Sequence, residues 1–381
     1  MTRRILVAFS LTVLFCVVFT MTLQPISTVA AINLKSGTVF VLTNQTSNAV
    51  AAFDRAPDGT LTFVGEFSTG GSGNPVAQEG DPPTNPLASQ GALVLSDNDH
   101  FLFAVNAGSN EISALSVDKD NLTLVDRVSS RGVRPISLTV HGDLLYVLNE
   151  DGTPNITGFT ISNKGELTPL AGSTRPLSAG SSGDPAEVSF NTDGSLLVVT
   201  DKLANVIDVY VVGSNGVAGP PTPNGTNGMR PFGFAFDQGN HLIVSETGGA
   251  PNAAAVSSYT VVPSKLSVVT GSVRNSQTAA SWIVITKSGQ YVFTTNAGSG
   301  AVSSYTLTST GELTLLNSAA ANLGAISFPI DIALSNGSRY LYVIAAGLQT
   351  VEAFRVEPDG SLTPIGSVGG LPFGTQGIAA R

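Results

Sequence analysis

Seven apolar segments of the sequence each end at one position, and most of these terminal residues carry an amide or a carboxylate. They are Asn44, Asn106, Asn149, Asp201, Glu246 and Asn296, with Ala345 as the exception. A short Asn or Asp side chain at the end of a strand commonly closes its own turn by bonding the backbone two residues on. Glu246 fits that role poorly because its side chain is longer. We therefore single it out as a candidate for chemistry.

More charged side chains occur in the loops that precede these segments, at Arg134, Asp184, Glu187, Arg230 and Asp331. In an antiparallel sheet, the start of one strand and the end of the next lie at the same edge. The charged loops and the segment ends are thus expected on one face of the molecule. Arginine and carboxylate side chains on one face could bind or activate a small polar ligand.

Two of these carboxylates, Glu187 and Asp331, occupy equivalent places in their segments. The other copies have small residues or an indole there, at Ala92, Ser137, Gly233, Trp282 and Gly377. If this position faces a central channel, the channel is lined by small residues, two acids and Trp282. Such a channel could hold an organic ligand or a cation, or it could hold only water.

The elements that position these residues repeat about every 50 residues, a period typical of propellers. Each copy contains a short strand, a polar turn, an apolar strand, an alternating strand and a fourth strand rich in Leu and Thr. Seven such copies, without helical periodicity, predict an all-β, seven-bladed β-propeller with four antiparallel strands per blade. The last residues, 374–380, resemble a lone first strand. We expect them to complete the first blade and close the ring.

One insertion interrupts the spacing between the first two copies, at residues 70–88, which are rich in Gly, Pro and Asn. Two interpretations remain open for it. It is either a surface loop or a lid over the face that collects the charged residues.

Residues 1–31 have the order of a secretory signal: Arg3 and Arg4, an apolar run over 5–23, and small residues ending at Ala31. We expect cleavage after Ala31 and a secreted, cell-surface or periplasmic propeller over residues 32–381. Retention of the apolar run as a membrane anchor is the alternative.

The chain has 18 basic and 27 acidic residues and a net charge of −9, so nucleic acid is not an expected partner. Its one cysteine, Cys16, lies in the signal segment, and the three histidines fall in or beside turns. Zinc is therefore not expected. Calcium needs six to eight oxygen ligands, and no short binding loop supplies them. We expect a monomer without a cofactor, with calcium as the alternative.

The sequence resembles the seven-bladed propeller lactonase family, which includes the propeller-type 6-phosphogluconolactonase and the 3-carboxymuconate cyclase. The resemblance covers the chain after the signal and marks a secreted branch. It is carried by residues 230–236 (RPFGFAF), 242–246 (LIVSE), 280–284 (ASWIV) and 295–299 (TNAGS). It implies the hydrolysis or formation of a small lactone.

For such a reaction, the resemblance suggests Glu246 as the base and Arg230 as the cation for an oxyanion or a substrate carboxylate, with Arg134 in reserve. The expected substrate-binding residues are Arg134, Asp201, Glu187, Trp282, Asp331, Asn106, Asn149 and Asn296. The cytoplasmic enzymes of the family carry a histidine near the first strands and an arginine after the proline, whereas here Ile136, Ala186 and Phe232 follow the prolines. Export also disfavours a phosphogluconate substrate. The alternative is a non-catalytic propeller that binds a glycan or another partner on the same face.

Overall fold

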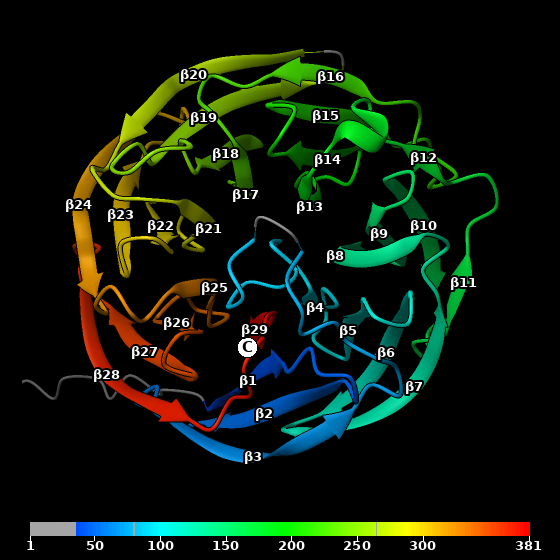
Figure 1. The fold of residues 1–381 in the computed structure, drawn as a ribbon, viewed down its shortest axis with the longest axis horizontal. Helices are drawn as coiled ribbons and strands as arrows, with labels where there is room; N and C mark the ends of the chain where they lie inside the picture. The colour runs from blue at the N-terminus through cyan, green and yellow to red at the C-terminus, as the bar shows by residue number, and fades with distance from the viewer. Residues whose placement is uncertain (1–35, 79–80, 264) are drawn as a thin grey trace, which may run out of the picture. The chain divides into compact units, whose positions relative to one another are not determined.

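The computed structural model describes residues 36–78, 81–263 and 265–381. The predicted signal segment lies outside the described residues. Within the described part of the chain, no helix is long and apolar enough to cross a membrane. The described residues form a ring of seven four-stranded antiparallel blades, which confirms the predicted fold (Figure 1).

The first three blades, from the channel outwards, contain the following strands. Blade 1 consists of β29 (Ile378–Ala380), β1 (Gly37–Leu42), β2 (Ala49–Arg55) and β3 (Leu61–Ser68). Blade 2 consists of β4 (Leu93–Leu95), β5 (Phe101–Asn106), β6 (Glu111–Asp118) and β7 (Asn121–Ser129). Blade 3 consists of β8 (Val133–His141), β9 (Leu144–Asp151), β10 (Asn155–Ile161) and β11 (Leu167–Pro169), with the short β12 (Arg175–Pro176) also paired to β10.

The remaining blades repeat this order after the 3₁₀ turn η1 (Gly180–Ser182). Blade 4 consists of β13 (Pro185–Phe190), β14 (Leu196–Asp201), β15 (Val206–Val211) and β16 (Thr222–Gly225). Blade 5 consists of β17 (Pro231–Phe236), β18 (His241–Glu246), β19 (Ala255–Val262) and β20 (Lys265–Arg274). Blade 6 consists of β21 (Ala280–Ile285), β22 (Tyr291–Asn296), β23 (Ala301–Leu307) and β24 (Leu313–Asn322). Blade 7 consists of β25 (Pro329–Leu334), β26 (Tyr340–Ala345), β27 (Thr350–Val356) and β28 (Leu362–Gly369).

Ring closure takes the predicted form. The C-terminal β29 pairs antiparallel with β1, with Val41 opposite Ile378 and Val39 opposite Ala380 (Figure 1). The last strand of the chain is thus the innermost strand of the first blade. This pairing covers the inner edge of β1 and gives blade 1 its fourth strand.

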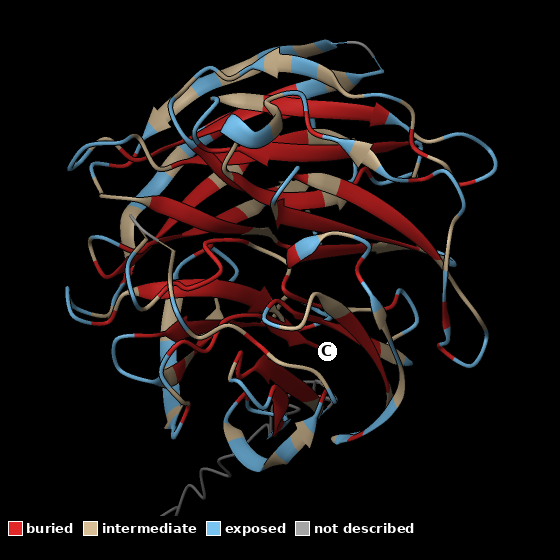
Figure 2. Cartoon of the chain, turned by 45° about the vertical axis from the view of Figure 1, so that its right-hand side comes forward, coloured by how far each residue is buried: buried red, intermediate tan, exposed pale blue. Residues whose placement is uncertain are grey.

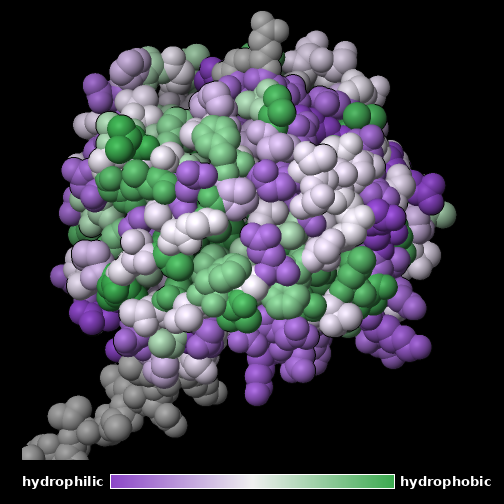
Figure 3. Space-filling view, turned by 60° about the horizontal axis from the view of Figure 1, so that its bottom comes forward, coloured by the Kyte–Doolittle hydropathy of each residue, from purple (hydrophilic) through white to green (hydrophobic). Residues whose placement is uncertain are grey.

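The core lies between neighbouring blades and is built from their second and third strands. β26 is buried along its whole length, as its apolar sequence requires, and so is β14, although it ends in Thr200 and Asp201. Figure 2 shows that buried residues fill the inner strands and that exposed residues gather at the periphery. The fourth strands alternate between exposed and partly buried residues, which places them at the outer edge. The outer strand β3 carries exposed apolar side chains at Phe63 and Val64. Figure 3 shows hydrophobic and hydrophilic residues mixed on one side of the molecule.

The insertion between β3 and β4 crosses the centre of the ring (Figure 1). Its residues 85–90, which we call the plug, are held by side chains from across the ring. Trp282 Nε1 of blade 6 donates to Ser89 O at 2.8 Å, and Gln376 Oε1 accepts from Leu87 N at 2.9 Å. Lys202 Nζ of blade 4 donates to Ala88 O at 2.9 Å. The plug is therefore held in place by contacts from several parts of the ring, and the lid interpretation stays a prediction.

Gln90 joins the plug to the innermost strand of blade 6. Its Oε1 accepts from Ile283 N at 2.9 Å and its Nε2 donates to Ile283 O at 3.0 Å, so it pairs with the backbone of blade 6. A Cβ at Gly233 would lie 2.2 Å from Gln90 Oε1. The glycine in blade 5 thus leaves the space that Gln90 occupies.

Candidate functional site

Glu246, the predicted base, points into blade 5. Its Oε1 accepts hydrogen bonds from Gly228 N at 2.9 Å and from the Ser257 hydroxyl, and its Oε2 accepts from Ser272 Oγ at 2.7 Å. The residue is 1% exposed. These contacts make Glu246 a buried link between β18, β19, β20 and the preceding loop. Its role as a base stays a prediction, and the geometry favours a different carboxylate.

Asn106 and Asn296, which end their strands as Glu246 does, are also buried and hydrogen-bonded inside their blades. Asn106 Oδ1 accepts from Asn48 Nδ2 and Thr69 Oγ1, and its Nδ2 donates to Ser113 Oγ. Asn296 makes the same bond to the equivalent Ser303 at 2.8 Å. The expected local turn bonds are replaced by bonds to neighbouring strands and loops, because these side chains point into the blade.

The other two predicted members of this series are also buried. Asn149 Nδ2 donates to Ser130 O at 3.2 Å and to Asn155 Oδ1 at 3.1 Å. Asp201 Oδ1 accepts from Asp184 N at 3.1 Å and from Ala204 N at 2.9 Å, so this residue does close its own turn. None of the predicted substrate-binding positions Asn106, Asn149, Asp201 or Asn296 lines the two cavities described next.

The residues that follow the strand ends do line those cavities. Successive side chains of a strand point to opposite sides, so the residue after a strand-end position turns away from the blade interior. Glu150, Lys202, Thr247 and Ala297 follow Asn149, Asp201, Glu246 and Asn296, respectively, and all four face a cavity. Charged residues stand at this position in blades 3 and 4.

The first cavity has a volume of about 360 Å³ and lies beside the plug. Its lining includes Asp81, Lys202, Arg230, Phe232, Thr247 and Ala297. Both cations and the carboxylate thus face one space, next to an aromatic ring. This combination suits a small ligand with a polarised or anionic oxygen.

Lys202 is fixed in this cavity by several groups. Its Nζ lies 2.9 Å from Asp184 Oδ1 and donates to Ala88 O of the plug. It also lies 5.3 Å from the centre of the Phe232 ring, which in turn packs against Trp282 at 4.8 Å. A buried ammonium with these partners is held in one place, which lowers the entropic cost of contacting a ligand.

Arg230 has a different environment. Its backbone adopts a φ of 57° and its N–H donates to Asn205 Oδ1 at 2.6 Å. Arg134 and Ala279 start their blades with the same left-handed backbone, so this conformation belongs to the repeat. The Arg230 side chain is exposed, and no described carboxylate lies within 4 Å of its guanidinium. The Arg230 guanidinium is therefore accessible to a ligand, and its predicted role stays a prediction.

Asp81 is the carboxylate that shares the first cavity with these cations. Burial raises the pKa of Asp81 above its ordinary value, while the charges of Lys202, Arg134 and Arg230 lower it. A carboxylate with a raised pKa accepts a proton more readily near neutral pH. Asp81 belongs to the insertion, so no repeat position could have identified it from the sequence.

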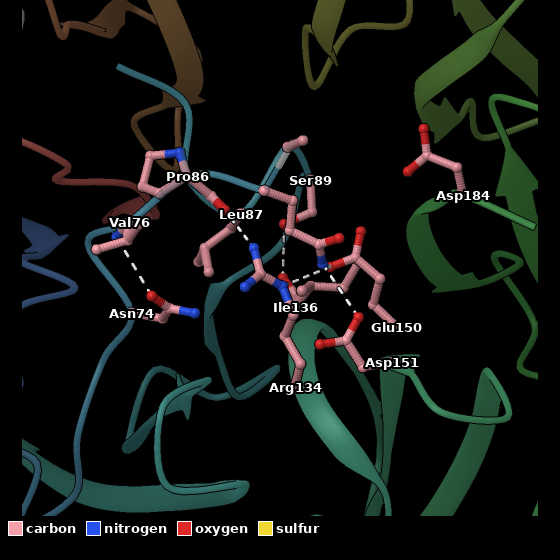
Figure 4. Close-up of polar contacts among 12 residues, drawn as sticks. Asn74, Val76, Pro86, Leu87, Ser89, Arg134, Ile136, Glu150, Asp151 and Asp184 are labelled. Carbon is pink, nitrogen blue, oxygen red and sulfur yellow. Dashed lines mark hydrogen bonds and ion pairs between the residues drawn. The ribbon is translucent and has the colours of Figure 1, made fainter. Parts of the chain in front are cut away.

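A second cavity of about 360 Å³ shares Asp81 and Arg230 with the first. Its lining also includes Gln78, Glu150, Asp151 and Asp184. Arg134 Nε binds Glu150 Oε2 at 2.6 Å, so Arg134 is paired (Figure 4). Arg134 also donates to Pro86 O and thereby holds the plug. Burial raises the pKa of Glu150 to about 7.

Gln78 ties the insertion to blade 3. Its Nε2 donates to Glu150 Oε2 at 3.0 Å and to Asp151 Oδ1 at 3.1 Å, and Asp184 stands apart from this group (Figure 4). The insertion thus supplies both a wall and a carboxylate to the cavities.

The predicted channel residues Glu187, Asp331 and Trp282 have structural contacts. Glu187 Oε2 accepts from Phe234 N of the next blade at 2.7 Å. Burial raises its pKa well above the ordinary value. Asp331 Oδ1 accepts from Ile332 N at 3.0 Å, and the backbone amides of Gly377 and Ile378 also interact with the carboxylate. Their predicted part in substrate binding stays a prediction, and the contacts favour linking of adjacent blades.

Within the described residues, no three His, Cys, Asp or Glu side chains are grouped so that they could hold a metal ion. The carboxylates of the second cavity are thus not arranged as a metal centre. Of the two predicted arginines, Arg230 lines both cavities, whereas Arg134 lines neither and is paired with Glu150. The sequence analysis did not name Asp81, Glu150, Asp151 or Lys202, which line the cavities. The alternation of side chains along a strand was the signal that could have identified Glu150 and Lys202.

Comparison with known proteins supports the fold and a family. The family model described as "Lactonase, 7-bladed beta-propeller" matches residues 35–179 and 247–370. The unmatched residues between these ranges include Asp184, Lys202 and Arg230. No protein of curated function matches the chain.

Several solved structures have the same fold. A protein from Lactobacillus plantarum is 17% identical, with a TM-score of 0.70, and the match covers 90% of this chain and 99% of that one. A candidate 6-phosphogluconolactonase from Bacteroides fragilis is 17% identical, with a TM-score of 0.63 and coverage of 90% and 97%. The periplasmic gluconolactonase of Pseudomonas aeruginosa is 16% identical, with a TM-score of 0.64 and coverage of 90% and 98%. At these identities, the likeness concerns the fold alone.

Proposed function

Because the chain belongs to the lactonase family of seven-bladed β-propellers, we propose that it hydrolyses a small lactone in the first cavity. The observation that carries this proposal is the meeting of Asp81, Lys202 and Arg230 around one space. The family indicates the bond that is broken, and this cavity offers the base and the cations that its hydrolysis needs. The exported location predicted from the sequence remains part of the proposal.

In this mechanism, Asp81 accepts a proton from water as the water oxygen bonds to the lactone carbonyl carbon. The carbonyl oxygen becomes an oxyanion, which Lys202 and Arg230 stabilise with their charges and N–H groups. The bond between the carbonyl carbon and the ring oxygen then breaks. The ring oxygen takes the proton back from Asp81, and the product is a hydroxy acid.

The size of the cavity limits the substrate. About 360 Å³ is at the lower end of the volumes typical for ligand pockets, so it suits a single small ring better than a polymer. The plug separates this space from the channel and supplies Ala88 as part of its lining. The ligand is therefore expected to enter and leave from the exposed face.

A binding propeller without turnover is the second candidate. Exposed apolar side chains on the same face favour it, because they could contact a partner: Leu203 is 63% exposed, Met229 59% and Ile326 78%. Serine at Met229 and Ile326, which line neither cavity, should then weaken partner binding. The same change should leave lactone turnover intact if hydrolysis is the function.

The test measures hydrolysis of a panel of five- and six-membered lactones by the purified protein and by Arg230→Gln. We expect turnover by the natural protein and a loss of about 100-fold in kcat/KM for the variant, since a cation at the oxyanion is removed. The Arg230 side chain has no described ion pair, so folding should be unaffected. Arg131→Gln, an exposed arginine of the same face outside both cavities, is the control. Turnover that is equal in all three proteins would refute the proposed site.

A further inference from the structure

The two cavities that meet at Asp81 and Arg230 differ in charge. In the first, the charged lining residues are Lys202, Arg230 and Asp81, so cations predominate. In the second, Arg230 is the single cation of the lining and stands opposite Asp81, Glu150, Asp151 and Asp184. The first cavity favours an electron-rich oxygen, and the second favours a group that donates hydrogen bonds.

The carboxylates of the second cavity are held in place and still have acceptor atoms to offer. Glu150 and Asp151 each use one oxygen to accept from Gln78 Nε2, and Asp184 uses Oδ1 to bind Lys202. Among the described residues, none donates to Glu150 Oε1, Asp151 Oδ2 or Asp184 Oδ2 within hydrogen-bond distance. An ionised carboxylate accepts hydrogen bonds and donates none, so hydroxyl groups are its natural partners.

From this difference in charge, we propose that the second cavity is a hydroxyl-binding subsite that accepts the polyol chain of a sugar-acid lactone. The proposal rests on the proposed function, because the lactone carbonyl lies in the first cavity between Lys202 and Arg230. The hydroxyl chain then extends past Asp81 toward Asp151 and Asp184. The substrate class is an aldonolactone with an uncharged chain.

A phosphate at the end of that chain is disfavoured by the same residues. It would bring a dianion to the wall formed by Glu150 and Asp151. Arg134 and Lys202 are already paired with Glu150 and Asp184, and Arg230, the one cation of this lining, is assigned to the lactone carbonyl. Like charges a few ångströms apart repel strongly in a site of reduced polarity. The subsite therefore discriminates by repelling the wrong ligand as well as by binding the right one.

The experiment compares two product ligands, gluconate and 6-phosphogluconate, by titration calorimetry at fixed ionic strength. Binding is read without turnover, so the subsite is tested apart from catalysis. We expect gluconate to bind at least about tenfold more tightly, and Asp151→Asn to reduce this preference by about fivefold because one repelling charge is removed. Asp143→Asn, an exposed residue on the opposite face of blade 3, should leave the preference unchanged.

Equal or tighter binding of 6-phosphogluconate would overturn the subsite. The subsite would also be overturned if neither ligand bound. A preference for gluconate that Asp151→Asn leaves intact would also overturn it. Hydrolysis of glucono-δ-lactone, measured in parallel, tests the proposed function separately. A protein that binds gluconate with the expected preference but hydrolyses no lactone keeps the subsite and refutes the catalytic step.

Discussion

The residues that end the second strands and the residues that directly follow them differ in what they contact. Glu246 and Asn296 are buried in their blades and bind neighbouring strands, whereas Lys202 and Glu150 face the cavities. The residue at the strand end thus stabilises the blade, and the next residue along the chain lines a cavity of the candidate site. Polarity at a strand end therefore indicates function only when the side of the strand is known.

The largest expected effect concerns Glu246 as a structural residue. Glu246→Ala removes the acceptor of Gly228 N, Ser257 Oγ and Ser272 Oγ and should lower the free energy of unfolding by about 2–4 kcal/mol. Denaturant unfolding measures this change. Glu312→Ala, at an exposed turn, should change stability by less than about 0.5 kcal/mol. Equal stability of both variants would contradict a structural role for Glu246.

Asp331, a predicted channel residue, is a second buried polar residue that lies outside both cavities. Burial raises its pKa from 3.8 to about 7, so the folded protein holds this proton more tightly than the unfolded chain does. Its contribution to stability is complete below about pH 4 and is lost as the pH rises to about 7. Asp331→Asn should therefore gain about 2–4 kcal/mol relative to the natural protein between pH 4 and pH 8. A difference that is constant with pH would contradict this assignment.

A smaller effect is expected at the plug. Gly233→Ala places a Cβ 2.2 Å from Gln90 Oε1 and 2.7 Å from Ser281 O, so the plug must shift. We expect a loss of about 1–3 kcal/mol and faster amide exchange at Ile283, whose N–H donates to Gln90. Gly142→Ala, at a turn glycine with open space around it, has no such neighbour, although its φ of 61° adds local strain. Unchanged exchange at Ile283 in Gly233→Ala would contradict the fit between Gln90 and Gly233.

The fold could be predicted from the sequence because each blade repeats the same local pattern of turns and apolar strands. The pairing of β29 with β1 followed from one surplus first strand at the C-terminus. The face that carries the candidate site also followed from strand direction. These are properties of local sequence and of the repeat.

The site was less predictable for two physical reasons. Asp81 and Gln90 reach their positions through the insertion, and long-range contacts with Lys202, Trp282 and Ile283 determine where it lies. Glu150 and Lys202 were missed because strand ends were compared by residue type, without assigning the side of each strand. Arg230 was found because its loop opens directly on the exposed face.

The central claim is that the chemistry lies in the cavity and not at the strand ends, and the two isosteric variants Asp81→Asn and Glu246→Gln test it most directly. The measurement is kcat/KM for the best lactone of the panel, per folded molecule, in both variants and the natural protein. The account predicts a loss of at least about 100-fold for Asp81→Asn and less than about threefold for Glu246→Gln. A folded Glu246→Gln protein without turnover, beside an active Asp81→Asn protein, would contradict it.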